Sequence, residues 1–283
     1  MNSMKIEAIK PHIGGIVHLA KSQLLDDNVV AATREALEDR GVLVFPSLNL
    51  TEAEQLRFTD KFGKRLNYTK KAPGSGAGDE ADVYAITLDK NVNTQPEYVI
   101  GTFFWHIDGV TINQPLPKAT LLTARQLSPY GGQTEFASTY AAYEALSADE
   151  KSVIADLKVI HKMEAGMRPV FETFAAEDLK RWRGMSDVME HPLVWTHESG
   201  RKSLVVGTHA DTVVGMPVAH GRSLLVRLQE WAAQPAFSYR HEWKPGDLVM
   251  WDNCGVMHRV VPYDENSGRL MHRTTIAGEE RVA

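Results

Sequence analysis

The chain has 283 residues, 43% of them apolar and 24% charged, and its formal net charge is −5. This composition is ordinary for a soluble globular enzyme and excludes a disordered or fibrous chain, while basic residues spread along the sequence argue against a nucleic-acid-binding surface. The single cysteine cannot form an internal disulfide, and no apolar stretch reaches the ~20 residues of a membrane span. The N-terminus lacks the apolar core of a signal peptide, so we expect a cytoplasmic protein.

The first part of the chain, about 1–65, is predicted to be a mixed α/β cap. Apolar residues at helical spacing from 26 to 41 end at Gly41, which is typical of a helix stop. The run VLVF that follows indicates a buried strand. Thr51 with Glu54 three positions later is a capping-box pattern, so a second helix should begin there.

Within a single domain of residues 1–283, two segments are predicted to be lid loops, about 68–100 and 163–190. The first contains KKAPGSGAGDEAD, which is rich in Gly, has no apolar period and lacks a phosphate-binding fingerprint. The second is polar and irregular.

From residue 82 onward, short β-prone runs recur between turn signals, a pattern typical of a sandwich or jelly roll. The runs are DVYAITL, YVIGTFFW, ATLLTARQL, GQTEFAS, HPLVWTH, KSLVVG, FSYRHEW, DLVMWDN, GVMHRVV and LMHRTTIAG. Two helical regions interrupt them. Ser147 and Glu150 form a capping-box pattern, and Leu224, Leu228 and Trp231 share one helical face. We therefore expect a mainly β fold with flanking helices.

The run FFWHIDGVTI, residues 103–112, places His106 and Asp108 two positions apart at the end of a β-prone segment, so both side chains would share one strand face. A non-haem iron(II) oxygenase centre needs two histidines and one carboxylate, which leaves three positions for cosubstrate and dioxygen. The pair alone is not specific, because THADT repeats the spacing at His209 and Asp211. The alternative for either pair is a turn aspartate beside a surface histidine. Aromatic residues precede His106, whereas threonines flank the second pair.

His258 is the candidate third ligand, because it follows the tight turn DNCG and enters an apolar strand. A core histidine bonded to a backbone carbonyl is the alternative. Further along, Arg269 and Arg273 are four positions apart, which puts both guanidinium groups on one face of a strand. A structural salt bridge or a solvated edge strand would explain them equally well.

These motifs together resemble the iron(II)- and 2-oxoglutarate-dependent dioxygenases of the taurine dioxygenase and chlorophenoxyacetate dioxygenase (TauD/TfdA) type. The resemblance runs through GVLVFPSLNLTEAEQLRFTDKFG, WHID, GGQTEF, HPLVWTHESGRKSLVVG, GDLVMWDNCGVMHR and RLMHRTTIAG. It implies a double-stranded β-helix, the jelly roll of the clavaminate synthase-like type, with the metal ligands at its mouth.

The resemblance also implies roles for particular residues. The implied Fe(II) ligands are His106, Asp108 and His258. Arg269 would pair with the distal carboxylate of the cosubstrate 2-oxoglutarate, and Thr134 in YGGQTEF would help to hold the same carboxylate. Arg273 would receive the anionic group of the primary substrate. With dioxygen in the last iron position, the expected reaction is hydroxylation with release of succinate and carbon dioxide.

The expected substrate is a small organic anion. The last third of the chain looks closer to the chlorophenoxyacetate enzyme, so an aryloxy or other carboxylate is preferred over a sulfonate. Phe104, where taurine-specific members carry polar residues, would either line the substrate pocket or pack within a strand. Desaturation or multistep oxidation of an amino-acid-derived acid is an alternative, as are a metal-dependent hydrolase or isomerase and a non-catalytic binding protein. Relatives commonly self-associate, so a homo-oligomer is expected.

Overall fold

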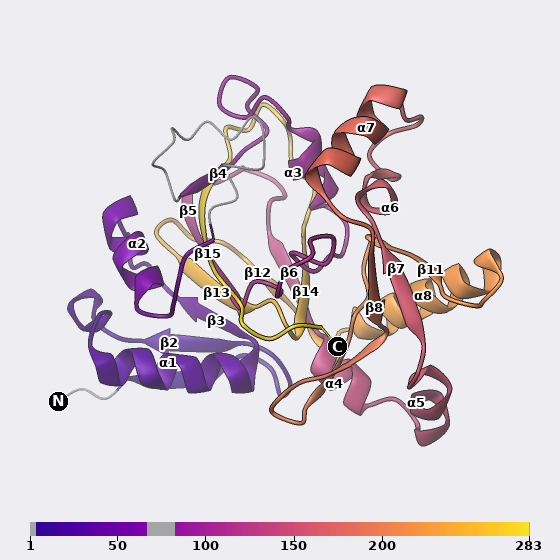
Figure 1. Ribbon diagram of the computed structural model, residues 1–283. Coiled ribbons are helices and arrows are strands. Elements are labelled where there is room, and N and C mark those ends of the chain that lie inside the picture. Colours follow the sequence, from indigo (N-terminus) through magenta and orange to yellow (C-terminus); the bar gives the residue numbers. More distant parts are fainter. Residues whose placement is uncertain (1–3, 67–82, 283) are drawn as a thin grey trace.

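The structure is a computed structural model that describes residues 4–66 and 83–282, and its described strands build one large sheet and three smaller ones (Figure 1). The strands of the large sheet, in spatial order, are β1 (Lys5–Ala8), β2 (Gly15–His18), β3 (Val42–Phe45), β13 (Leu248–Asp252), β5 (Ala119–Gln126), β15 (Leu270–Ile276) and β4 (Tyr84–Ile86). All of these pairings are antiparallel except that of β2 with β3. Strands from both ends of the chain thus lie side by side.

A second, three-stranded sheet packs against the inner face of the large one. Its strands, in spatial order, are β12 (Ser238–His241), β6 (Thr134–Ser138) and β14 (Val256–Val260). Phe136 and Val256 of this sheet share one buried apolar cluster with Val249, Trp251 and Met271 of the large sheet. Two facing antiparallel sheets around a common core form the predicted jelly roll.

The outer face of the large sheet is covered by two helices from the N-terminal part of the chain, α1 (Asp27–Arg40) and α2 (Glu52–Asp60) (Figure 1). Strand β13 shows how the sequence produces both faces, because its side chains alternate. Leu248 and Met250 point toward the helices, whereas their neighbours Val249 and Trp251 point into the jelly roll. The predicted helices of the cap are confirmed, and the cap's strands β1 to β3 extend the large sheet.

Most of the remaining elements lie on the side of the molecule away from α2 (Figure 1). The strands are β7 (Lys158–His161), β8 (Met189–Pro192), β9 (Val194–Thr196), β10 (Lys202–Leu204) and β11 (Ala210–Val213). The helices are α4 (Thr139–Glu144), α5 (Ala148–Ile154) and α8 (Val218–Ala232). The capping box of Ser147 and Glu150 and the helix around Leu228 are confirmed. Within the described ranges, no helix combines the length and the apolar character needed to cross a bilayer.

Several predictions about local structure were wrong. The run YVIGTFFW, predicted as a strand, begins as helix α3 (Glu97–Gly101) and continues as turns. The predicted irregular segment 163–190 contains helices α6 (Met163–Met167) and α7 (Ala176–Met185). The predicted loop at 68–100 falls partly outside the described residues, and its described part contains β4 and α3.

Candidate active site

The structure brings His106, Asp108 and His258 together. Each offers a ligand atom, and these atoms all lie within 4.8 Å of one another. The Asp108 carboxylate lies between the two imidazoles, with Oδ1 3.9 Å from Nε2 of His106 and Oδ2 3.8 Å from Nε2 of His258. Among the residues that the structure describes, no other set of three His, Cys, Asp or Glu side chains has this geometry.

Backbone hydrogen bonds between His106 and His258 position the two histidines, although His106 does not lie in a strand. The His106 amide donates to the His258 carbonyl oxygen at 3.0 Å, and the His258 amide donates back to the His106 carbonyl oxygen at 2.9 Å. His258 lies in β14, whereas His106 makes only this single bridge and Asp108 begins a turn. The prediction that His106 and Asp108 share a strand face was therefore wrong, although both side chains reach the same point.

Both imidazoles are suited to bind a cation. The His106 Nδ1–H donates to the Phe104 carbonyl oxygen at 2.9 Å, which leaves the Nε2 lone pair directed at the cluster. Burial lowers the pKa of His106 and that of His258, so both rings are neutral, the form that coordinates metals. Burial raises the pKa of Asp108, but the positive charge of Arg273 opposes it, and this pKa is lowered to about 2. Two neutral imidazoles and one carboxylate are the donors that non-haem iron(II) prefers.

Arg269 lies just before β15 and is only 1% exposed. Its guanidinium carbon lies 4.8 Å from the centre of the Tyr263 ring, and its Nη2 donates to the Gly132 carbonyl oxygen at 3.0 Å. Its Nε and Nη1 are buried and have no hydrogen-bond partner among the described residues. A buried cation with two unused donors in a fixed plane fits a carboxylate, so these residues fit a dicarboxylic cosubstrate such as 2-oxoglutarate.

Thr134 begins β6 and is 1% exposed. Its neighbour on β14 is Val260, two residues beyond His258. The Nε1–H of Trp243 donates to Thr134 Oγ1 at 3.0 Å. Sequence analysis missed Trp243, because the segment HEWKPGD reads only as a strand end followed by a turn.

Arg273, on β15, has a charged partner within the site. Its Nη2 lies 2.6 Å from Oδ2 of Asp108, and its Nε donates to Thr275 Oγ1 at 3.2 Å. The side chain also lines the pocket, together with His106 and Asp108. Arg273 is thus placed to contact both a ligand carboxylate and a molecule in the pocket.

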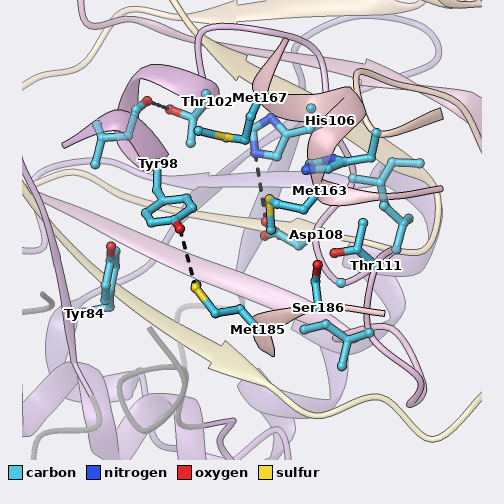
Figure 2. Close-up of a pocket in the computed structure, with 18 of the residues that line it drawn as sticks. Tyr84, Tyr98, Thr102, His106, Asp108, Thr111, Met163, Met167, Met185 and Ser186 are labelled. Atoms are coloured by element: carbon cyan, nitrogen blue, oxygen red, sulfur yellow. Dashed lines mark hydrogen bonds and ion pairs between the residues drawn. The ribbon is translucent and has the colours of Figure 1, made fainter. Parts of the chain in front are cut away.

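The pocket has a volume of about 320 Å³ and opens directly beside His106 and Asp108 (Figure 2). Its lining includes five large apolar or aromatic side chains: Tyr84, Tyr98, Met163, Met167 and Met185. Phe104 is not part of the described lining, because the chain there turns after α3, and its carbonyl oxygen instead accepts from His106.

The second His-x-Asp pair does not match the alternative of a turn aspartate beside a surface histidine, because His209 is half-buried and Asp211 is buried. His209 lines the pocket and is packed against Gly166 of α6, and burial lowers the pKa of His209 to about 4. Asp211 is buried and pairs with Lys162, Arg168 and Arg222. Neither residue belongs to the three-residue cluster.

Comparison with known proteins finds dioxygenases that match nearly the whole chain. A family model described as "Taurine catabolism dioxygenase TauD, TfdA family" matches residues 5–275. The alpha-ketoglutarate-dependent 2,4-dichlorophenoxyacetate dioxygenase of Burkholderia sp. (strain RASC) is 34% identical, over 98% of this chain and 95% of that protein. The (S)-phenoxypropionate/alpha-ketoglutarate-dioxygenase of Sphingobium herbicidovorans is 32% identical, over 94% and 92%.

A solved structure, AAD-2 in complex with Mn(II) and N-oxalylglycine, superposes with a TM-score of 0.82 at 32% identity, and the match covers 99% of this chain and 100% of that one. This likeness confirms the jelly-roll fold inferred from the sheets. The family model, the sequence relatives and the solved structure thus agree, and the chain belongs to the TauD, TfdA family of dioxygenases.

Proposed function

We propose that this protein uses iron(II), 2-oxoglutarate and dioxygen to hydroxylate a small aryloxy carboxylate or a related organic acid. The observation that carries the proposal is the convergence of His106, Asp108 and His258 beside a pocket. His106, Asp108 and Arg273 line that pocket. The relatives support it, because their names include alpha-ketoglutarate and chlorophenoxy or phenoxy acids.

The residues divide the work between metal and cosubstrate. His106, Asp108 and His258 would hold the iron, and their two neutral rings and one carboxylate leave part of its coordination sphere open. Arg269 and Thr134 would bind the far carboxylate of 2-oxoglutarate. When bound, the iron and cosubstrate supply the oxidative chemistry, in which 2-oxoglutarate becomes succinate and carbon dioxide and one oxygen atom enters the substrate. His106 and His258 are buried, which would limit the access of water to the metal from their side.

The lining of the pocket supports an aromatic substrate. Met163, Met167 and Met185 are flexible and polarisable, and methionine sulfur makes favourable contacts with aromatic ring edges. Figure 2 shows these side chains with Tyr98 around Asp108. Arg273 would receive the carboxylate, which places the carbon next to that carboxylate near the metal. A sulfonate would satisfy Arg273 equally well, so the preference for a carboxylate rests on the relatives.

The test uses the purified protein without oxygen. Iron(II) and 2-oxoglutarate should together produce the visible charge-transfer band of a chelated 2-oxo acid, and the His258→Ala variant should not produce it. Air and a panel of aryloxy acids, alkyl sulfonates, sulfate esters and amino-acid-derived acids should then reveal substrates through the amount of succinate formed. A colourless protein that makes no succinate with any of these would exclude the oxygenase. An alkene among the products would show that the enzyme desaturates its substrate instead of hydroxylating it.

A further inference from the structure

The contact between Trp243 and Thr134 has a consequence for cosubstrate binding. We infer that Trp243 is a positioning residue for 2-oxoglutarate, because its indole N–H sets the Thr134 hydroxyl as a hydrogen-bond donor toward the distal carboxylate. The inference rests on the proposed roles of Thr134 and Arg269. It assigns a role to a residue that would not itself touch the cosubstrate.

The argument begins with the number of protons on each group. A threonine hydroxyl has one proton to donate and two lone pairs to accept with, whereas an indole nitrogen only donates. Since Trp243 Nε1–H points at Thr134 Oγ1 from 3.0 Å, the hydroxyl proton cannot be directed at Trp243. It must point elsewhere.

The surroundings restrict where that proton can go. Thr134 lies in the central strand of the sheet β12-β6-β14, between His241 on one side and Val260 on the other, so its backbone groups serve the strand pairing. Its side chain is shielded from bulk water. An acceptor supplied by a ligand is therefore the natural partner, and accepting from the indole makes the hydroxyl a stronger donor in turn.

Arg269 supplies the other half of the carboxylate site. Its Nη2 is used by Gly132, two residues before Thr134, and its Nε and Nη1 lack partners among the described residues. Gly132 has φ +78, and a Cβ there would lie 2.9 Å from the Arg269 Nε, so a side chain would displace the guanidinium. The unused N–H groups of Arg269 and the oriented O–H of Thr134 are all donors, which suits the acceptor-only carboxylate.

The indole is itself held in place. The rings of His241 and Trp243 meet edge to face with centroids 4.6 Å apart. His241 is fixed at both nitrogens, since Nε2 lies 3.1 Å from the Asp247 carboxylate and Nδ1 lies 2.9 Å from the Tyr239 hydroxyl. The orientation of the Trp243 N–H is therefore set by packing and hydrogen bonds before any ligand arrives.

The experiment is a double-mutant cycle on cosubstrate binding, measured by anaerobic calorimetry with metal-loaded protein. We expect Thr134→Val to raise the Kd for 2-oxoglutarate about tenfold and Trp243→Phe to raise it about three- to tenfold, as for loss or weakening of one charge-assisted hydrogen bond. The double variant should bind no more weakly than Thr134→Val alone, because the indole acts only through the hydroxyl. Thr134→Ser should restore most of the affinity. Affinity for the metal alone should not change.

A matched control is available in α8. The Trp231 Nε1–H donates to the Ala142 carbonyl oxygen at 2.9 Å, and Trp231 packs against a different apolar cluster from Trp243, so Trp231→Phe should leave the Kd unchanged. If Trp243→Phe does not fold, benzothienylalanine at position 243 keeps the ring size and replaces the N–H by sulfur, and it should give the same weakening.

The outcomes separate the two levels of inference. Wild-type protein that binds no 2-oxoglutarate would overturn the proposed function. Normal binding by Thr134→Val would remove Thr134 from the carboxylate site and the role of Trp243 with it. Weak binding by Thr134→Val together with normal binding by Trp243→Phe, or independent effects that multiply in the double variant, would overturn the inference about Trp243 alone.

Discussion

Arg269 and Arg273 lie four residues apart, yet their surroundings differ in one decisive respect. Arg273 has a carboxylate partner in Asp108, whereas the contacts of Arg269 are an aromatic ring and a carbonyl oxygen. A buried guanidinium next to neutral groups is costly unless an anion completes its environment. The two residues are therefore expected to respond differently to substitution.

Replacing Arg269 by Ala should raise the apparent KM for 2-oxoglutarate by at least about tenfold, because the far carboxylate loses a charged hydrogen-bonding partner worth ~1.5–3 kcal/mol. Arg269→Lys should recover part of the loss, since a lysine keeps the charge but not the planar fork. The measurement is succinate formation at varied 2-oxoglutarate. An unchanged KM in Arg269→Ala would show that another group binds this carboxylate.

Replacing Arg273 by Ala should raise the KM for the primary substrate by about tenfold or more, since a charged hydrogen bond is lost. Formation of succinate without substrate should continue, because 2-oxoglutarate is expected to bind at Arg269. Comparing succinate with and without the aryloxy acid makes the distinction. Loss of 2-oxoglutarate binding in this variant would mean that the two arginines have exchanged roles.

Among single residues, the sequence identified those whose type and spacing indicate their chemistry. His106, Asp108 and His258 were named as a set, and the structure places them together. It did not identify Trp243 or the position of His209 in the pocket lining. Those depend on which strands and helices meet across more than a hundred residues, which no local pattern records.

Helices α6 and α7 show where elements escape sequence analysis. Their segment is largely polar, with apolar side chains too scattered to give a helical period. The anchor is Trp182, which is fully buried and packs against the rings of Phe171 and Phe174. In YVIGTFFW a helix was predicted as a strand. A short apolar run fits a strand and a buried helical turn equally well.

Two helical glycines provide a test of how α6 shapes the pocket. A Cβ at Gly166 would lie 2.6 Å from Cδ2 and Nε2 of His209, whereas a Cβ at Gly184 in α7 would meet nothing within 4 Å. Gly166→Ala should therefore destabilise the protein by ~1–3 kcal/mol and weaken substrate binding, since His209 must shift. Gly184→Ala should stabilise it by ~0.5–1 kcal/mol through helix propensity alone.

Denaturant unfolding and the KM of the primary substrate measure both variants. Equal effects of the two substitutions would show that contact with His209 does not restrict position 166.

On the scale of the whole molecule, Asp211 joins parts that are distant in sequence. Its buried carboxylate on β11 pairs with Lys162 before α6, Arg168 after α6 and Arg222 in α8. Burial raises the pKa of Asp211, but the opposite effect of its three cationic partners is larger. The pKa is therefore lowered from the usual 3.8 to about 2. The carboxylate thus contributes stability above pH 3.8, and this contribution is lost as the pH falls toward 2.

Asp211→Asn should lower the free energy of unfolding near neutral pH by about 2 kcal/mol, a value between those for exposed and buried ion pairs, because the cations are partly exposed. The difference from wild type should shrink as the pH falls from 4 toward 2. Asp39→Asn is the control, because that side chain is 75% exposed and lies 3.9 Å from Arg40. It should change stability by less than ~0.5 kcal/mol. A pH-independent effect of Asp211→Asn would show that the charge itself is unimportant.

The reciprocal amide–carbonyl pair between His106 and His258 bears on how the enzyme would survive damage to its metal. These bonds hold the two backbones together whatever the rings coordinate, so releasing an ion breaks coordination bonds but leaves the polypeptide framework in place. Inactivation by oxidation and escape of the ion would then be repairable. A reductant and fresh ferrous salt should suffice for recovery, with no cycle of unfolding and refolding.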